Sequence, residues 1–257
     1  MVSKIEKACH NIYYLGVKVS VVIPAFNEEK LLGACVEAVR AAFAAAGPAP
    51  DYEIIVCNNN SSDKTAEIAA ALGAKVVFEP LNQMGAARNT GAAAAAGLWL
   101  IFLDADSVLS AATLRAALGL MRGGAAAGGG ALIGFFPDTP WWALVMTAVW
   151  NAVSRWFSLA AGSFMFCRAD AFRAVGGFDR RVYAGEELLL SRAVRRWGRT
   201  RGLAFRIITA APHLSSSRKF FIYGFWGVIL TDVRIVLSPF RVLRSAARLP
   251  IYYDVRR

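Results

Sequence analysis

The segment that most constrains the fold is Leu98–Ser107, LWLIFLDADS, in which an apolar run ends at two aspartates. Six apolar residues between a glycine and an aspartate are typical of a strand that is buried on both faces of a parallel sheet. Ligands of such sheets collect at the carboxyl ends of the strands, where Asp104 and Asp106 would lie. Two carboxylates at that edge suit Mg²⁺ or Mn²⁺, which favour oxygen ligands. The alternative is that they cap the next helix or shape a turn.

The residues before this segment alternate between predicted strands and predicted helices. We predict strands at 18–23, 52–57 and 75–78, and helices from 27 to about 46, at 64–72 and within 82–97. Asn27 is a candidate N-cap of the first of these helices. The β-α-β-α-β-α-β order favours one α/β domain with a mostly parallel sheet.

The second half of the chain is less regular. After a helix predicted at 111–122, the Gly/Ala-rich segment 123–130 is predicted to be a linker, followed by strands at 131–136 and 164–168. Helices are predicted at 169–175 and 186–197. The aromatic segments 140–161 and 220–237 contain polar or charged residues, which argues against transmembrane helices in both.

Positive charge is concentrated in the last quarter of the chain. Residues 192–257 hold 14 Lys/Arg and two Asp, whereas the rest is nearly neutral. Such a block suits anionic lipid or a phosphorylated substrate, or is simply a solvated face. We expect no nucleic-acid partner, because no binding module is recognisable and the region is too apolar. Scattered cysteines and an N-terminus without a sustained apolar stretch predict a cytoplasmic protein without disulfides or zinc.

Four segments recur in order at the predicted strand ends: VSVVIPAFNEEKLL, IIVCNNNSSDKTAEIA, NQMGAARNTGAAAAAG and WLIFLDADS. Together with GSFMFCRADAFRAVGGFDRRVYAGEELLLSRAVRRWG, they resemble family 2 glycosyltransferases of the GT-A fold. The resemblance implies a single α/β domain with a Rossmann-like sheet flanked by helices. Residues 1–122 would form its nucleotide-sugar-binding half, 123–215 its acceptor and catalytic half, and 216–257 a helical, aromatic and basic extension.

The resemblance also implies a metal-dependent, inverting transfer of a sugar from a nucleoside diphosphate to an acceptor hydroxyl. Asp106 would bind Mn²⁺ or Mg²⁺, and Asp104 would lie near the ribose and diphosphate. Arg88 would face the diphosphate or form a structural ion pair, and Glu28 would border the base or only complement a helix dipole. The complete expected nucleotide-sugar site comprises Pro24, Ala25, Asn27, Glu28, Asn58, Asn59, Arg88, Asp104, Ala105 and Asp106.

Asn58 and Asn59 stand where many relatives have two aspartates. An asparagine can still accept a hydrogen bond from a base or ribose and can also donate one. Nucleotide binding is therefore retained in principle, but the base is left open, with UDP favoured over GDP.

Inversion requires a carboxylate that takes the acceptor's proton on the face opposite the leaving group. Glu186 and Glu187 match the family's acidic pair, with Glu187 at the usual aspartate position, but either could be the base, or both could only complement the helix N-terminus. Gly162 and Ser163 would form the acceptor side. His213 would complete the metal site or be structural, with a loop containing Arg218 and Lys219 closing over the diphosphate.

The C-terminal extension is predicted to contact an anionic membrane peripherally, on the inner face of the cell membrane. Its aromatic residues are Phe220, Phe221, Tyr223, Phe225 and Trp226, and its cations include Arg241, Arg244 and Arg248 on a basic amphipathic helix at 240–249, with Arg256 and Arg257 beyond it. The alternatives are a helix packed over the acceptor site and a homodimer contact. A membrane contact would suit a lipid-linked or cell-envelope acceptor.

Two other functions remain at this stage. One is a non-catalytic relative that binds nucleotide-sugar or membrane, since a fold alone does not establish activity. The other is nucleotidyl transfer, which is disfavoured because the loop after the first strand, PAFNEE, contains no glycine.

Overall fold

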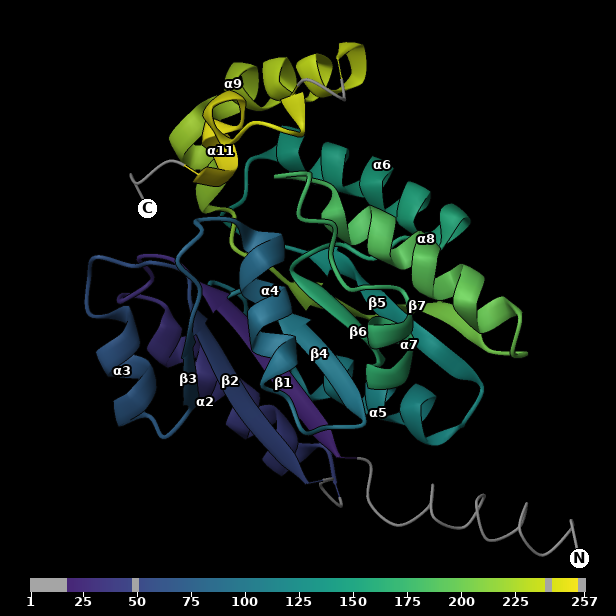
Figure 1. Cartoon of the computed structure of the whole chain (residues 1–257). Helices are drawn as coiled ribbons and strands as arrows, with labels where there is room; N and C mark the ends of the chain where they lie inside the picture. Colours follow the sequence, from purple (N-terminus) through teal and green to yellow (C-terminus); the bar gives the residue numbers. More distant parts are fainter. Residues whose placement is uncertain (1–17, 48–50, 239–241, 254–257) are drawn as a thin grey trace, which may run out of the picture.

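A computed structural model describes residues 18–47, 51–238 and 242–253. These residues form a seven-stranded sheet in the order β3-β2-β1-β4-β6-β5-β7 (Figure 1). The strands β1 (Val19–Ala25), β2 (Tyr52–Asn58), β3 (Lys75–Phe78) and β4 (Trp99–Leu103) run parallel. β6 (Phe164–Arg168) is antiparallel to its neighbours β4 and β5 (Ala126–Gly134), and β7 (Ala204–Leu214) is parallel to β5. The mostly parallel sheet is therefore confirmed.

Helices cover both faces of this sheet (Figure 1). Helices α2 (Leu32–Ala45), α3 (Thr65–Ala71) and α5 (Ala111–Arg122) pack in one apolar cluster with Ile101 and Leu103. Helices α4 (Met84–Ala93), α7 (Ala169–Ala174) and α8 (Glu186–Arg199) share the other cluster with Leu100 and Phe102. Alternate residues of β4 thus face opposite layers, which explains why its whole sequence is apolar.

Two further helices lie beyond the carboxyl ends of the first strands. α6 (Trp141–Phe157) and α9 (Arg218–Leu237) meet through the Trp142 ring, whose centroid lies 5.4 Å from those of Phe220 and Phe225. α11 (Pro250–Tyr253) packs beside α9 (Figure 1). None of the helices within the described ranges is long and apolar enough to cross a membrane.

The predicted linker at 123–130 is wrong, because its glycines lie inside β5. A Cβ atom on Gly129 would collide with the Arg206 carbonyl oxygen and the Phe166 ring. The neighbouring strands therefore approach too closely for a larger residue. Composition alone does not distinguish such a crowded strand from a flexible linker.

Two predictions about helices are also wrong. Asn27 does not cap α2, which begins at Leu32; instead Asn27 has a left-handed φ of 53°, and its side-chain oxygen accepts from the Ser62 N–H. In the described part of 240–249, Val242 is helical, a turn follows it, and a separate short 3₁₀ helix spans Ala246–Arg248, so no continuous helix runs through the segment. The expected basic amphipathic helix is therefore not formed there, while Arg241, Arg256 and Arg257 lie outside the described residues.

Candidate active site

A cavity of about 610 Å³ lies where β1 and β4 end, and α6 and α9 contribute to its lining. One part, which we call the charged wall, comprises Glu28, Asp104, Asp106, Glu187 and Arg218. The other part, the apolar wall, comprises Ile133, Met146, Trp150, Val228, Ile235, Leu243 and Ile251. The cavity therefore combines a site for charged groups with a lining that favours apolar ones.

Most of the residues that the sequence predicts for the site line this cavity. They are Pro24, Ala25, Glu28, Asn59, Asp104, Ala105, Asp106, Gly162, Ser163, Glu187, Arg218 and Lys219. Five other predicted residues are outside the lining: Asn27, Asn58, Arg88, Glu186 and His213. The sequence did not single out the residues of the apolar wall.

Arg218, at the start of α9, connects two strand ends of the charged wall. Its Nη2 atom lies 2.7 Å from Glu28 Oε1 and 3.3 Å from Asp106 Oδ2, and its Nη1 atom donates to Glu28 Oε2 at 3.3 Å. Burial lowers the pKa of Arg218, but these two carboxylates outweigh it and raise the pKa above its ordinary value. A permanent positive charge is thus held beside the second aspartate of the D-A-D segment.

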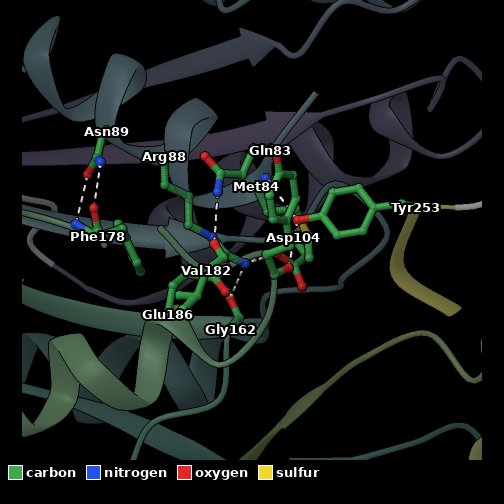
Figure 2. Close-up of polar contacts among 11 residues, drawn as sticks. Gln83, Met84, Arg88, Asn89, Asp104, Gly162, Phe178, Val182, Glu186 and Tyr253 are labelled. Atoms are coloured by element: carbon green, nitrogen blue, oxygen red, sulfur yellow. Dashed lines mark hydrogen bonds and ion pairs between the residues drawn. The ribbon is translucent and has the colours of Figure 1, made fainter. Parts of the chain in front are cut away.

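Arg88 is a buried arginine of α4 that holds two carboxylates from different parts of the chain (Figure 2). Its Nη1 atom lies 2.7 Å from Glu186 Oε1, and its Nη2 atom lies 2.8 Å from Asp104 Oδ1. Nη2 also donates to the Gly162 carbonyl at 3.3 Å. Gly162 must be small, because a Cβ there would lie 2.9 Å from that nitrogen. Arg88 therefore orients one aspartate and anchors the start of α8.

Two side-chain amides, from Gln83 before α4 and Asn89 within it, hold the backbone of the segment that leads into α8 (Figure 2). Gln83 Nε2 donates to the carbonyls of Arg180 and Val182 at 2.9 and 2.8 Å. Asn89 exchanges two hydrogen bonds of 2.9 Å with the backbone of Phe178. Neither role is apparent from the sequence, where the only signal is an amide residue on each side of Arg88, at the start of and within an alanine-rich helix.

The first turn of α8 separates the two adjacent glutamates. Gly185, with a left-handed φ of 77°, precedes the helix. Glu186 is 1% exposed and points to Arg88, whereas Glu187 lines the cavity. Burial and the neighbouring Glu186 raise the pKa of Glu187 to about 8. Glu187 is thus a carboxyl group poised to exchange a proton near neutral pH.

His213 is buried at the end of β7 and stacks on Phe164, with ring centroids 5.2 Å apart. Burial lowers its pKa to about 4, so the imidazole is neutral at physiological pH. Neither ring nitrogen hydrogen-bonds any residue that the structure describes. An orphaned neutral imidazole fits a metal ligand chemically, although the described residues contain no group of three His, Cys, Asp or Glu arranged around a metal position.

The asparagines after β1 and β2 mainly shape their loops. The side-chain oxygen of Asn58 accepts from the Ser61 N–H at 2.9 Å. Of Asn27, Asn58 and Asn59, Asn59 lines the cavity and the other two do not. In the side-chain orientation that satisfies both its amide nitrogen and its amide oxygen, Asn59 donates to the Leu81 carbonyl and accepts from the Gln83 N–H. Hydrogen bonds between the two loops, such as Asn27 N–H to Ser61 Oγ at 3.0 Å, hold them together.

Comparison with known proteins gives a consistent result. A family model described as "Glycosyl transferase family 2" matches residues 20–176, more than half of the chain. An uncharacterized glycosyltransferase of Mycobacterium tuberculosis is 38% identical over 99 residues, which cover 38% of this chain and 41% of the relative. Glycosyltransferase AglE of Haloferax volcanii is 37% identical over 94 residues, which cover 34% of this chain and 30% of AglE. The match thus spans less than half the length of these relatives.

Solved structures share the architecture at low sequence identity. S. aureus TarS 1-349 in complex with UDP has a TM-score of 0.60 at 14% identity, covering 88% of this chain and 71% of that chain. Glucosyl-3-phosphoglycerate synthase from M. tuberculosis, in complex with Mn²⁺, UDP and phosphoglyceric acid, has a TM-score of 0.57 at 18% identity. That match covers 88% of this chain and 80% of the synthase. At these identities the similarity shows the fold, which is of the GT-A type.

Proposed function

Because the chain belongs to glycosyl transferase family 2, we propose that it transfers a sugar from a nucleoside diphosphate sugar to an acceptor hydroxyl. The observation that carries this proposal is the convergence of Asp106, Arg218 and Glu187 on one cavity, from segments far apart in the sequence. The cavity thus holds groups for a metal, a diphosphate and a proton. The UDP in the two structures described above supports UDP as the nucleotide.

On the donor side, Pro24, Ala25, Glu28 and Asn59 border the base and ribose, while Arg218 and Lys219 face the diphosphate. Asp106 and His213 are the proposed ligands of Mn²⁺ or Mg²⁺, which would offset the charge that develops on the departing diphosphate. The Mn²⁺ in the synthase structure supports this assignment. Asp104 keeps its ion pair with Arg88 and thereby fixes the loop that carries Asp106.

On the acceptor side, Glu187 is the proposed base, because it lines the cavity while Glu186 is engaged by Arg88. The acceptor oxygen bonds to the anomeric carbon as the bond from that carbon to the diphosphate breaks. The acceptor proton passes to a Glu187 carboxylate oxygen, and the anomeric configuration inverts. Glu186 is a positioning residue in this scheme, and Gly162 and Ser163 border the acceptor.

We place this activity in a reducing compartment such as the cytoplasm. Cys35, Cys57 and Cys167 are buried free thiols, as is usual for proteins that are not exposed to oxidising conditions. Burial raises the pKa of each of these thiols, so they are unreactive and carry no part of the chemistry.

A nucleotide panel tests the proposal. UDP with Mn²⁺ should raise the melting temperature of the protein, since a ligand that binds the native state stabilises it by mass action. GDP should do so less. Asp106→Ala should remove the metal-dependent part of the shift and the hydrolysis of UDP-sugars, whereas Glu67→Ala, an exposed carboxylate of α3, should change neither.

Two outcomes would contradict the proposal. If neither nucleotide stabilises the protein with Mn²⁺, the cavity is not a donor site. If UDP stabilises it but a panel of UDP-sugars is neither transferred nor hydrolysed, the chain is the non-catalytic relative that the sequence left open. The anomeric configuration of the product, measured by NMR, tests inversion separately.

A further inference from the structure

The outward face of α6 is apolar along its whole length. Most of its exposed apolar residues recur every three or four positions, as one face of a helix requires: Trp141, Leu144, Val145, Ala148, Val149, Ala152 and Trp156. Arg155 and Phe157 are exposed beside Trp156. The side chains of Trp141 and Trp156, near its two ends, are 77% and 84% exposed. A surface helix ordinarily turns its apolar face inward, so this face lacks its usual covering.

α9 lies beside α6 and also exposes apolar residues, on both sides of a kink at Gly224 (Figure 1). Its exposed residues include Phe221, Ile222, Phe225, Trp226, Leu230, Val233 and Leu237. Trp226 is 70% exposed and Leu237 is 76% exposed. Apolar residues gathered in this way, rather than scattered singly, mark a binding surface.

The charges on and around these two faces are mostly positive, although Asp138, three residues before α6 begins, is also exposed. Arg155 is exposed at the end of the α6 face, and Arg234 is exposed within the α9 face. The neighbouring helix α8 exposes four more arginines, Arg192, Arg195, Arg196 and Arg199, and Arg195 donates to the Phe157 carbonyl at the end of α6. α6 contains no acidic residue, and the only one in α9, Asp232, lines the cavity.

This charge pattern indicates which kind of partner covers the surface. A second copy of the chain in a symmetric dimer would present the same face, with the same six arginines and only Asp138 nearby as an exposed acid of the segment that leads into α6. A bilayer that contains anionic lipid offers both an apolar interior for the tryptophans and negative headgroups for the arginines. Membrane-facing tryptophans and arginines at one level are typical of proteins that lie in such an interface.

The cavity connects this surface with the charged wall. Met146, Thr147 and Trp150 of α6 line it, as do Ile222, Val228 and Ile235 of α9. The helices that carry the exposed faces therefore also supply much of the apolar wall. An amphiphile could keep its chain against that wall while its hydroxyl approaches Glu187.

We propose that the outward faces of α6 and α9 form a docking surface for a bilayer containing anionic lipid, from which an amphiphilic acceptor reaches the cavity. The acceptor part of this inference rests on the proposed glycosyl transfer, whereas the docking part does not. The docking surface thus comprises α6 and α9, rather than the basic helix expected at 240–249.

Vesicle flotation of the full chain tests the docking surface. We expect it to float with vesicles of phosphatidylglycerol and phosphatidylcholine, and at least tenfold less with phosphatidylcholine alone. Replacing Trp156 and Trp226 together by serine should lower binding to anionic vesicles at least tenfold. The matched control replaces Phe78 and Leu98 together by serine. These residues are 57% and 61% exposed elsewhere on the molecule, and their replacement should leave binding unchanged.

Two further measurements separate the explanations. Brominated lipid should quench the tryptophan fluorescence of the unmodified protein, which needs no variant to fold. Stabilisation by UDP with Mn²⁺ should persist in the Trp156→Ser/Trp226→Ser variant, so loss of flotation would not reflect unfolding. If UDP binding fails in the unmodified protein while flotation succeeds, the proposed function fails and the docking surface stands.

The docking surface would be overturned by any of three results. The unmodified protein does not float with anionic vesicles at low salt; the double serine variant floats as well as the unmodified protein; or the variant changes from dimer to monomer in size-exclusion chromatography without losing flotation. The last result would assign the surface to a second copy of the chain.

Discussion

The charged and apolar walls of the cavity differ in how the fold builds them. The charged wall gathers residues that follow β1 and β4, together with the first turns of α8 and α9, and ion pairs of 2.7 to 3.3 Å tie it together. The apolar wall is held by contacts among rings and aliphatic side chains of α6, α9 and the C-terminal segment. Ion pairs and hydrogen bonds thus fix the positions of the side chains in the charged wall, while non-directional packing shapes the apolar wall.

Because the two walls are built differently, they distinguish different features of a ligand. Charged hydrogen bonds specify the position and number of ligand oxygens. An apolar wall rewards buried area and accepts chains of different shape, because the hydrophobic effect has no direction. We therefore expect a demanding donor site and a permissive acceptor site in one cavity.

The largest expected effect is on the charged wall. Glu187→Gln keeps the size of the side chain but removes the proposed proton acceptor, so turnover should fall about 1000-fold, within the range for a general base. The turnover of the unmodified enzyme should rise with pH towards about 8, the pKa of Glu187, because only the ionised carboxylate accepts a proton. Initial rates across pH 5–9 measure both.

The same assay includes its own control. Glu186→Gln should retain a rise of turnover with pH, because Glu186 does not line the cavity, but the rise should move to lower pH, because the charge of Glu186 helps to raise the pKa of Glu187. If Glu186→Gln abolishes the pH dependence and Glu187→Gln does not, the roles of the two glutamates are reversed.

The second prediction concerns the stability of the charged wall. Arg88→Met should lower the free energy of unfolding by about 3–5 kcal/mol, mainly because it leaves the buried Glu186 without its counter-charge, and the partly exposed Asp104 loses its partner as well. Urea denaturation measures this change. The control is Glu37→Gln, which removes only the solvent-exposed ion pair with Arg40 and should cost at most about 1 kcal/mol.

A double variant sharpens this prediction. Adding Glu186→Gln to Arg88→Met removes one of the two uncompensated charges, so part of the lost stability should return. Equal losses in the single and double variants would show that Arg88 acts by filling space rather than by charge.

The sequence predicts the charged wall well for a physical reason. In a parallel sheet, residues that follow different strands meet at one edge, so Asp104, Asp106 and Glu28 can be placed together without knowledge of packing. The choice between Glu186 and Glu187 could not be made in this way. It depends on which side of α8 faces the buried guanidinium of Arg88, and that contact joins residues 98 positions apart.

The apolar wall and the docking surface could not be predicted from the sequence in the same way. The helix that contains Trp141 and Trp156 is apolar on both faces, so periodicity does not tell the inward face from the outward one. The glycines of β5 mislead for a related reason, since their meaning depends on strands that pack against them. Packing between distant segments decides both cases.

The third prediction tests the permissive acceptor site. Octyl glucoside below its critical micelle concentration should bind at least tenfold more tightly than glucose, because its chain buries apolar area against the apolar wall. Ile235→Gln should weaken octyl glucoside binding about tenfold and leave the UDP-dependent shift unchanged. Leu237→Gln, on the same helix but outside the cavity, is the control. Quenching of tryptophan fluorescence measures the affinity, and equal weakening by both variants would contradict an acceptor site in the cavity.

The smallest expected effect is the pH dependence of stability. Because burial raises the pKa of Glu187, the unfolded chain loses this proton at lower pH than the folded protein does. The contribution of Glu187 to stability is therefore retained below the ordinary glutamate pKa and is lost as pH rises towards about 8. Glu187→Gln, which cannot ionise, should be more stable than the unmodified protein at pH 9 and nearly equal to it at pH 4.5. Urea midpoints at the two pH values measure the difference, with Glu67→Gln as an exposed control that should show none. If Glu187→Gln and the unmodified protein differ in stability by the same amount at both pH values, the pKa of Glu187 is not raised in the folded protein. Water would then reach this carboxyl group in the charged wall.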